Sequence, residues 1–256
     1  MKTNKNINSR VLFWLGIVIP IILWELLSRF GLISKIFIAS PLEVILALYT
    51  DLTNLVLLEH SSFTLVRAVV GFMIGSILGV ASGLILGKFK PIYTFFSAYI
   101  EFLRSIPVLS LFPLFLLFFG IGNVSKIMIA AWSSFFIVII PTIYGVTHIP
   151  QIKITVAELF GANKKQEFFH VILPAALPEI LAGLRIGISI SLIAVIVTEM
   201  FTGTKEGIGK YIYDAGLIYA TDKLYAGIAF AGLLGLIINK SFLFFENKYV
   251  HWKNKI

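Results

Sequence analysis

Residues that could catalyse a reaction or bind a nucleotide are sparse in this sequence. The nearest approach to a phosphate-binding loop is Gly203-Thr-Lys-Glu-Gly-Ile-Gly-Lys210, but the glycine spacing is wrong and Tyr211 follows where a magnesium-binding Ser or Thr would stand. There is no His-Glu-x-x-His metal motif and no Gly-x-Ser-x-Gly nucleophile motif. The four histidines are scattered, and there is no cysteine. The sequence therefore indicates neither an enzyme nor a metal site.

Acidic residues that could relay protons through a membrane are also missing. Glu199 is the one carboxylate deep in an apolar segment, and it stands alone there. Arg185, in the same segment, is 14 residues away, or about 21 Å at 1.5 Å per helical residue. The two cannot pair within one helix, so each is expected near one membrane interface. Any uphill transport must then take its energy from a partner.

The composition is that of a membrane protein. Of the 256 residues, 58% are hydrophobic and only 13% are charged, where a soluble domain has about a quarter charged residues. The net charge of +8 comes from basic residues that flank apolar runs, which is the membrane pattern and not a nucleic-acid-binding patch. The predicted fold class is an all-α, polytopic membrane protein.

Long apolar runs predict about six transmembrane helices, because a span needs roughly 20 residues. The first is expected to be an uncleaved span and not a signal peptide, since no small-x-small site follows it. Pro107 and Pro113 should break the third span. Between spans we expect a surface helix from Pro41 to about Leu58, an interfacial helix over 88–104 and a polar loop over 202–223. The predicted spans are 11–27, 68–87, 105–121, 127–146, 180–201 and 224–245.

Lysines and arginines predict the orientation, because they are enriched on the cytoplasmic side. With both termini inside, the cytoplasmic segments hold Lys2, Lys5, Arg10, Lys88, Lys90, Arg104, Lys153, Lys164, Lys165, Lys248, Lys253 and Lys255. The opposite segments hold Lys35, Lys126, Lys205, Lys210 and Lys223. This bias places residues 149–175 in the cytoplasm.

Glycines recur at every fourth position of the second predicted span. On a helix they form one stripe that lets a neighbouring backbone approach closely. Helix packing is the first interpretation, and a stripe that slides during gating is the alternative. The residues are Gly71, Gly75, Gly79, Gly83 and Gly87.

The segment 149–175 predicts two short helices joined by a turn. The first, Gln151–Phe160, should end at Gly161, and Asn163 should cap the second with Gln166 in a capping box. Pro174 and Pro178 are expected to end this second helix before the fifth span. Exposed apolar side chains on such a loop indicate a partner site. The expected ones are Val156, Leu159, Phe160, Phe168 and Phe169.

This segment resembles the EAA loop of permease subunits from bacterial ABC importers, with the pattern E-A-A-x3-G-x9-I-x-L-P. Ala157 matches the second alanine and Gly161 the glycine. Val171 takes the isoleucine position, and Leu173 and Pro174 match the final pair. Thr155 and Val156 replace the glutamate and first alanine, and Glu158 lies one position past the triplet. Around the match, Leu159 and Phe160 complete the expected docking surface.

Three further stretches resemble the nitrate/sulfonate/taurine branch of that family. They are Arg104-Ser-Ile-Pro-Val-Leu-Ser-Leu-Phe-Pro-Leu continuing to Gly122, Leu173-Pro-Ala-Ala-Leu-Pro178 continuing to Arg185, and Thr198-Glu-Met continuing to Gly209. The resemblance extends from about residue 11 to residue 250.

The resemblance implies a type I ABC importer permease, with residues 1–256 as one transmembrane domain in the bacterial inner membrane. Two such subunits, expected as a homodimer, would form the pathway for a small anion such as a sulfonate, taurine or nitrate. Two cytoplasmic ATPases would bind ATP and Mg²⁺, so this chain would bind no cofactor itself. A binding protein would deliver the solute, and Thr155–Pro174 would couple the ATPases to the pathway.

Four residues are candidates for the pathway or its gates. Arg104 and Pro107 could set a cytoplasmic gate, and Arg185 and Glu199 lie toward the ends of the fifth predicted span. Glu199 is interpreted as a structural cap at the outer mouth, with a gate residue as the alternative. A self-sufficient channel or secondary transporter is the rival function, and a membrane enzyme is the third option.

Overall fold

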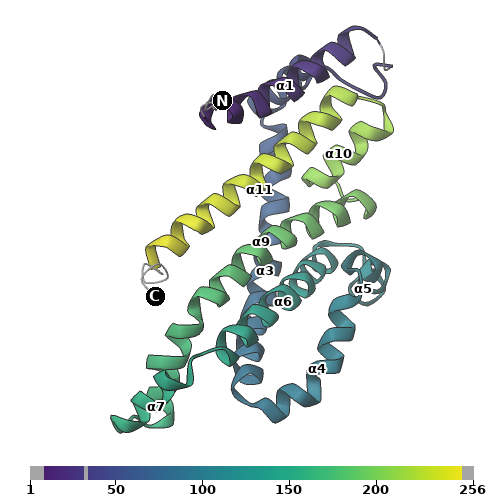
Figure 1. Cartoon of the computed structure of the whole chain (residues 1–256). Coiled ribbons are helices and arrows are strands. Elements are labelled where there is room, and N and C mark those ends of the chain that lie inside the picture. The colour runs from purple at the N-terminus through teal and green to yellow at the C-terminus, as the bar shows by residue number, and fades with distance from the viewer. Residues whose placement is uncertain (1–8, 32–33, 250–256) are drawn as a thin grey trace, which may run out of the picture. The chain divides into compact units, whose positions relative to one another are not determined.

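The computed structural model describes residues 9–31 and 34–249, and these residues form helices, turns and loops without a strand. They divide into two compact units, which are described separately. One unit comprises residues 1–59 and 211–231, and the other comprises residues 60–210 and 232–256. Two long helices, α3 (Val56–Lys88) and α11 (Thr221–Tyr249), run from one unit into the other (Figure 1). The prediction of one domain over 1–256 stays a prediction.

The first unit contains α1 (Ser9–Arg29), α2 (Pro41–Thr53) and most of α10 (Ile208–Leu217). Helix α2 begins at the predicted proline because Ser40 and Glu43 form a capping box there. It ends at Thr53, so the predicted end at Leu58 is wrong. The small core of this unit consists of Ala39, Val44 and Ala226, with Trp24 packed against them.

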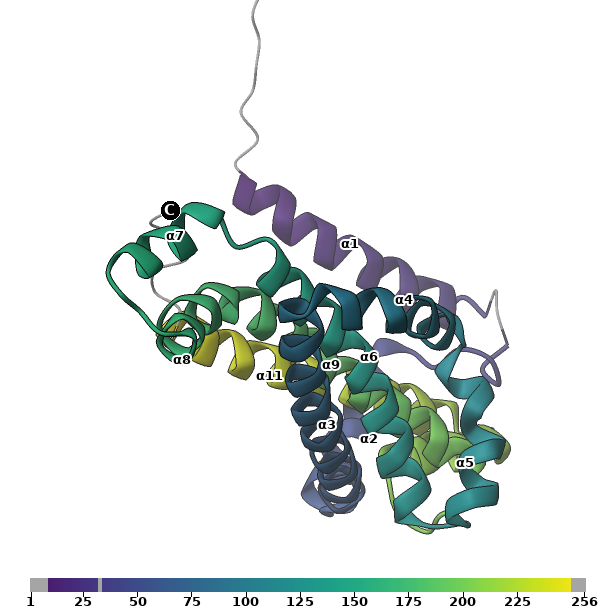
Figure 2. The ribbon, with the colours of Figure 1, turned by 90° about the horizontal axis from the view of Figure 1, so that it is seen from below.

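The second unit is built around α6 (Asn123–Thr147) and α9 (Leu173–Phe201), which pack on each other through small residues. A Cβ at Gly145 would lie 3.1 Å from the Ala176 carbonyl oxygen, and one at Gly183 would lie 3.1 Å from the Pro141 ring. Figure 2 shows these helices beside α3. The unit's other elements are α4 (Lys90–Ser105), η1 (Val108–Leu111), α5 (Phe112–Phe119), α7 (Gln151–Leu159), α8 (Lys164–Glu167) and the π-helical η2 (Phe168–Ile172).

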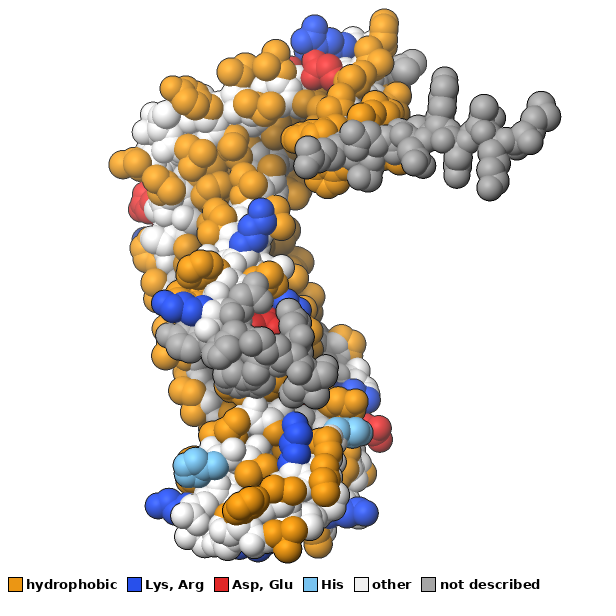
Figure 3. All heavy atoms as spheres, turned by 60° about the vertical axis from the view of Figure 1, so that its left-hand side comes forward, with side chains coloured by type: hydrophobic (Ala, Val, Ile, Leu, Met, Phe, Trp, Pro, Cys, Tyr) orange, Lys and Arg blue, Asp and Glu red, His pale blue; other side chains and the backbone are white. Residues whose placement is uncertain are grey.

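Five helical segments are long and apolar enough to cross a membrane, and a sixth crossing results if a bent helix pair counts as one span. The prediction of an all-helical protein with about six spans is confirmed. Figure 3 shows the hydrophobic side chains that such segments present, with few charged ones between them. The five segments are Val11–Arg29, Val56–Lys88, Asn123–Thr147, Lys164–Phe201 and Thr221–Glu246.

The third predicted span is wrong in its bounds. Helix α4 ends at Ser105, and the following segment, Val108–Phe119, turns away from it by 88°. The residues between them are extended, and Pro107 cannot donate a backbone hydrogen bond. The expected span over 105–121 is therefore one arm of a bent pair, in which α4 is the other arm.

Two other boundaries differ from the prediction. Helix α3 begins at Val56 and not at Ala68, so Arg67 lies inside it. The expected polar loop over 202–223 contains the helix α10. The charge bias toward the inside rests partly on Lys2, Lys5, Lys253 and Lys255, which lie outside the described residues.

The five glycines of α3 all face α6. A Cβ on Gly83 would lie 2.6 Å from Thr142 Cβ, and one on Gly87 would lie 2.6 Å from Val146 Cβ. A Cβ on Gly79 would lie 3.0 Å from a backbone carbonyl of α6. The two helix backbones approach closely only because these side chains are absent. Whether the stripe slides stays a prediction.

Candidate functional site

In the loop 149–175, the turn between the two short helices has the predicted structure. Helix α7 ends in a left-handed glycine, Gly161 (φ 77°), where other residues would be strained. The N–H of Ala162 then donates to the Ala157 carbonyl oxygen at 3.0 Å. Asn163 caps α8 in a capping box with Gln166. Figure 2 shows α7 and α8 at the end of their unit that lies away from α5.

Two large apolar side chains at the end of α7 are almost fully exposed. Leu159 is 81% exposed and Phe160 is 88% exposed, and Val156 on the same helix is 42% exposed. Thr155 and Glu158 are also exposed, whereas Ala157 is half-buried. An adjacent Leu–Phe pair held in solvent on a short rigid helix is the form of a protein-docking surface.

The second half of the loop was predicted to be exposed, but most of it is packed against the rest of the unit. Phe168 is partly buried against a core cluster with Ile172, and the Lys88 ammonium lies 5.0 Å from its ring centroid. Leu173 packs on the same cluster, and Val171 and Pro174 are half-buried. Phe168 is therefore not an exposed docking side chain, although Phe169 is 52% exposed.

Pro174 and Pro178 do not end the second helix. Residues 164–201 are helical throughout, with one π-helical turn at Phe168–Ile172. Pro174 comes directly after the π-helical turn, in the first turn of α9, and Pro178 is inside that helix. The loop is thus joined without a break to a membrane-crossing helix, so a displacement of α8 can pass directly into α9.

A salt bridge connects the two helices of the loop. The Lys164 ammonium lies 2.9 Å from the Glu158 carboxylate and 2.8 Å from that of Glu167. Glu158, the acid one position past the EAA-like triplet, thus has a partner across the turn. Because Lys164 is 73% exposed, the pair contributes little energy but favours one arrangement of the two helices.

The sequence suggested that Glu199 stands alone, but in the structure it has partners and is buried. Its carboxylate is fully buried and lies 2.6 Å from the Arg67 guanidinium of α3. It also accepts hydrogen bonds from the Thr64 hydroxyl at 2.9 Å and from the Gly209 N–H at 3.1 Å. Arg67 donates further to the Asn123 side chain and to the Glu206 carbonyl. We call these residues the Arg67–Glu199 network.

The loop between α9 and α10 closes over this network. The Ile208 N–H donates to Thr64 Oγ1 at 2.8 Å, and the Gly207 N–H lies 3.0 Å from His60 Nδ1. Lys126 is buried nearby and donates to the Gly122 carbonyl oxygen at 2.8 Å. The network therefore fixes the end of α9 to α3 and α6, and its two charged side chains, Arg67 and Glu199, pair with each other.

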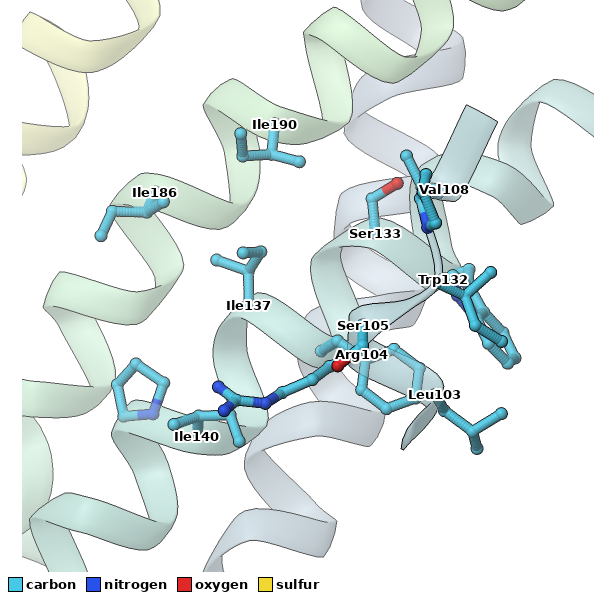
Figure 4. Close-up of a pocket in the computed structure, with 14 residues that line it drawn as sticks. Leu103, Arg104, Ser105, Val108, Trp132, Ser133, Ile137, Ile140, Ile186 and Ile190 are labelled. Carbon is cyan, nitrogen blue, oxygen red and sulfur yellow. The ribbon is translucent and has the colours of Figure 1, made fainter. Parts of the chain in front are cut away.

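A pocket of about 640 Å³ opens beside the bend between α4 and η1. Arg104 and Pro107 line it, together with residues of α6 and α9 (Figure 4). Arg185 and Glu199 do not line it. Of the four candidate pathway residues, the structure brings only Arg104 and Pro107 together at one cavity.

Comparison with known proteins identifies the family. The family model for the inner-membrane component of binding-protein-dependent transport systems matches residues 71–250, a range that includes the pocket and the loop 149–175. The chain belongs to this family. It is a multi-pass inner-membrane component, and its resemblance to ABC importer permeases is confirmed.

Relatives of this family component are transport permeases. The chain is 31% identical over 242 residues to the putative aliphatic sulfonates transport permease protein SsuC of Bacillus subtilis, covering 93% of this chain and 87% of the relative. It is 28% identical to the taurine transport system permease protein TauC of Escherichia coli, covering 99% and 98%. An inward-facing structure of the MetNI methionine ABC transporter matches with a TM-score of 0.64 at 20% identity, over 73% of this chain and 92% of that chain, and shows a shared fold.

Two ion pairs of the permease that matter for these sites were not predicted from the sequence. Arg67 lies one position before the predicted start of its span, and its partner is 132 positions away, so no local pattern joins them. Arg185 lies near the middle of the helical run 164–201 and not near its end, and it is 3.5 Å from Glu246 of α11. Both pairs join helices that are distant in sequence. The one available signal was that each charge interrupts an apolar run.

Proposed function

We propose that this permease carries a small organic anion of the sulfonate class and is driven by ATPase subunits that dock on the loop 149–175. Two permease subunits would enclose the pathway, a binding protein would deliver the anion, and both termini would be cytoplasmic. ATP and Mg²⁺ would be bound by the ATPases.

The exposed Leu159–Phe160 pair carries the proposal for docking. This pair lies at the end of a short helix that is not one of the membrane-crossing segments and that precedes one of them. The Lys164 salt bridges stiffen the turn behind it, and the uninterrupted helix 164–201 leads from it into the membrane. These features are what a lever between an ATPase and a transmembrane helix requires.

The substrate class rests on the relatives and on the pocket. SsuC and TauC are named for sulfonate and taurine transport. The pocket adds a single arginine to a lining that is apolar except for two serines. The two observations together favour a small anion with a carbon skeleton.

Co-purification with the ATPase tests the docking part of the proposal. The wild-type permease and a Leu159→Ala/Phe160→Ala variant would be purified from membranes and probed for a bound ATPase. The matched control is Leu117→Ala/Phe118→Ala, an adjacent pair with exposures of 80% and 72% on α5. We expect the ATPase with wild type and control and its loss from the loop variant. If wild type alone drives uptake in vesicles without ATP and binds no ATPase, a self-sufficient transporter is the correct assignment.

A further inference from the structure

The pocket beside the helix bend lies at the middle of the transmembrane helices. Its residues on α6 run from Trp132 to Pro141, which is about 14 to 27 Å from the start of that helix at 1.5 Å per residue. On α9 it is lined by Ile186 and Ile190, also well inside the helix. The bend therefore brings the end of α4 to mid-depth of the neighbouring spans.

Non-helical backbone at such depth is unfavourable unless its polar groups find partners. Between Ser105 and Val108 the chain is extended, and it turns by 88°. Free backbone groups at membrane depth are tolerated only where protein covers them or where they line a cavity that holds water or a ligand. Here the extended residues line the pocket.

Arg104 places a positive charge in this pocket. Its side chain is 48% exposed, and among the described residues the carboxylate that it contacts is that of Glu101 at 3.9 Å, which is itself 76% exposed and does not line the pocket. Figure 4 shows the guanidinium extended toward Ile137 and Ile140 of α6. A charged side chain at mid-depth is costly unless it meets water or an opposite charge, so its presence marks a functional site.

The rest of the lining limits what the arginine can hold. Aliphatic and aromatic side chains dominate, and the hydroxyls come only from Ser105 and Ser133. The Ser133 hydroxyl already donates to the Ile129 carbonyl oxygen at 2.7 Å. No lining residue is acidic, so an ammonium group on a ligand would find no partner there.

We infer that this pocket binds an organic sulfonate inside the permease, with Arg104 holding the sulfonate and the apolar wall holding its carbon chain. The inference deepens the proposed function, on which it rests. A guanidinium donates two parallel hydrogen bonds to a planar pair of oxyanion oxygens. The pocket size lies within the range of organic ligand sites, about 300 to 1,000 Å³, and is far larger than an inorganic anion needs. Alkyl and aryl sulfonates therefore bind better than the zwitterion taurine or a bare oxyanion.

Tryptophan fluorescence of the purified full-length permease in lipid nanodiscs gives a direct test, because Trp132 lines the pocket. Hexanesulfonate is the probe, and taurine, nitrate and hexyltrimethylammonium are the comparison ligands. We expect a saturable emission change with hexanesulfonate that is absent from Trp132→Phe. Taurine and nitrate should bind at least about tenfold more weakly, and hexyltrimethylammonium should not compete.

Charge variants locate the site. We expect Arg104→Gln to raise the Kd for hexanesulfonate at least about tenfold and Arg104→Lys to raise it less, since lysine keeps the charge but not the paired donors. Lys90→Gln, an exposed cation at the other end of α4, is the matched control and should bind as wild type. Unchanged binding in Arg104→Gln, equal affinity for taurine, or a signal that survives Trp132→Phe would overturn the inference.

ATPase co-purification and ATP-driven uptake, measured on the same variants, separate this inference from the proposed function. If Arg104→Gln keeps its ATPase, binds hexanesulfonate as wild type does and transports it normally, the pocket assignment is wrong and the importer stands. If wild type binds hexanesulfonate through Arg104 but associates with no ATPase, the pocket assignment stands and the importer does not.

Discussion

Arg67 and Arg104 both belong to the second unit, but their surroundings are opposite. The Arg67 side chain is 4% exposed, and a carboxylate, an amide oxygen and a carbonyl oxygen accept its hydrogen bonds. The Arg104 side chain is 48% exposed in a pocket of about 640 Å³, with one weak carboxylate contact. The Arg67 guanidinium donates to three acceptors of the protein, whereas that of Arg104 is left largely available to a ligand.

This difference separates structural charge from functional charge. A buried ion pair that is fully hydrogen-bonded holds helices together, and removing one partner leaves an uncompensated charge. An arginine that keeps free donors at mid-depth contributes little to stability, because no protein contact depends on it. The position of a charge within an apolar run therefore does not tell its role, whereas its partners do.

Glu199→Gln should show the largest loss of stability. It leaves the buried Arg67 guanidinium without its carboxylate, and breaking such a pair costs about 3–5 kcal/mol. Unfolding of the purified protein in detergent, followed by heat or denaturant, measures this loss. Glu101→Gln is the control, since its carboxylate is 76% exposed and 3.9 Å from Arg104, and it should change stability by less than about 0.5 kcal/mol. Equal stability of the two variants would remove the distinction between the arginines.

Tyr211→Phe tests a buried polar pair in the first unit. The Tyr211 hydroxyl donates to the Asp51 carboxylate at 2.5 Å, and Asp51 is 5% exposed. Loss of the donor leaves a buried carboxylate with a missing bond, at a cost of about 1–3 kcal/mol. Tyr49→Phe, at an exposed position on α2, should have no such effect. A loss as small as that of Tyr49→Phe would show that burial does not set the cost.

The same pair predicts a pH dependence. Burial, and then the hydrogen bond to Asp51, raises the pKa of the Tyr211 hydroxyl above its usual value. A raised pKa in the folded state means that this contribution to stability is complete below about pH 10, the ordinary tyrosine value, and is lost as the pH rises further. Unfolding measured between neutral pH and pH 11 should show a steeper alkaline decline for wild type than for Tyr211→Phe. Parallel curves would contradict this assignment.

Ser40→Ala should have a smaller effect, because the capping pair that it breaks is uncharged on one side and only partly buried. The Ser40 hydroxyl accepts from the Glu43 N–H at 3.2 Å, and the Glu43 carboxylate accepts from the Ser40 N–H at 2.8 Å. Loss of such a cap costs about 1 kcal/mol. Faster hydrogen exchange in the first turn of α2 measures it, and Ser34→Ala, outside the helix, is the control. Unchanged exchange in that turn would show that Pro41 alone defines the helix start.

The sequence predicted features that depend on neighbouring residues. The lengths of the apolar runs predicted the membrane-crossing segments. The left-handed Gly161 and the Asn163 cap follow from local backbone chemistry. The proline at position 107 predicted a break in the third span. It could not predict an 88° turn, because the direction of the chain after a break depends on what the next helix packs against.

Features that depend on distant residues were not predicted. The partners Arg67 and Glu199 are 132 positions apart, and neither position shows a pattern that identifies the other. Phe168 was expected outside as one of the exposed apolar side chains of a docking loop, but the unbroken helix into α9 turns its ring toward the Ile172 cluster. Periodicity indicates an apolar face, and only the tertiary fold decides whether another helix covers that face.

Arg104→Gln should have the smallest effect on stability and a large effect on the ligand. No buried partner depends on this arginine, so its free energy of unfolding should stay within about 0.5 kcal/mol of wild type. If the variant unfolds as easily as Glu199→Gln, then Arg104 is a structural residue like Arg67, and its openness to the pocket has no functional meaning. If it is as stable as wild type but loses hexanesulfonate, then two arginines in the same unit have different roles. The protein completes the hydrogen bonds of Arg67, and a solute completes those of Arg104.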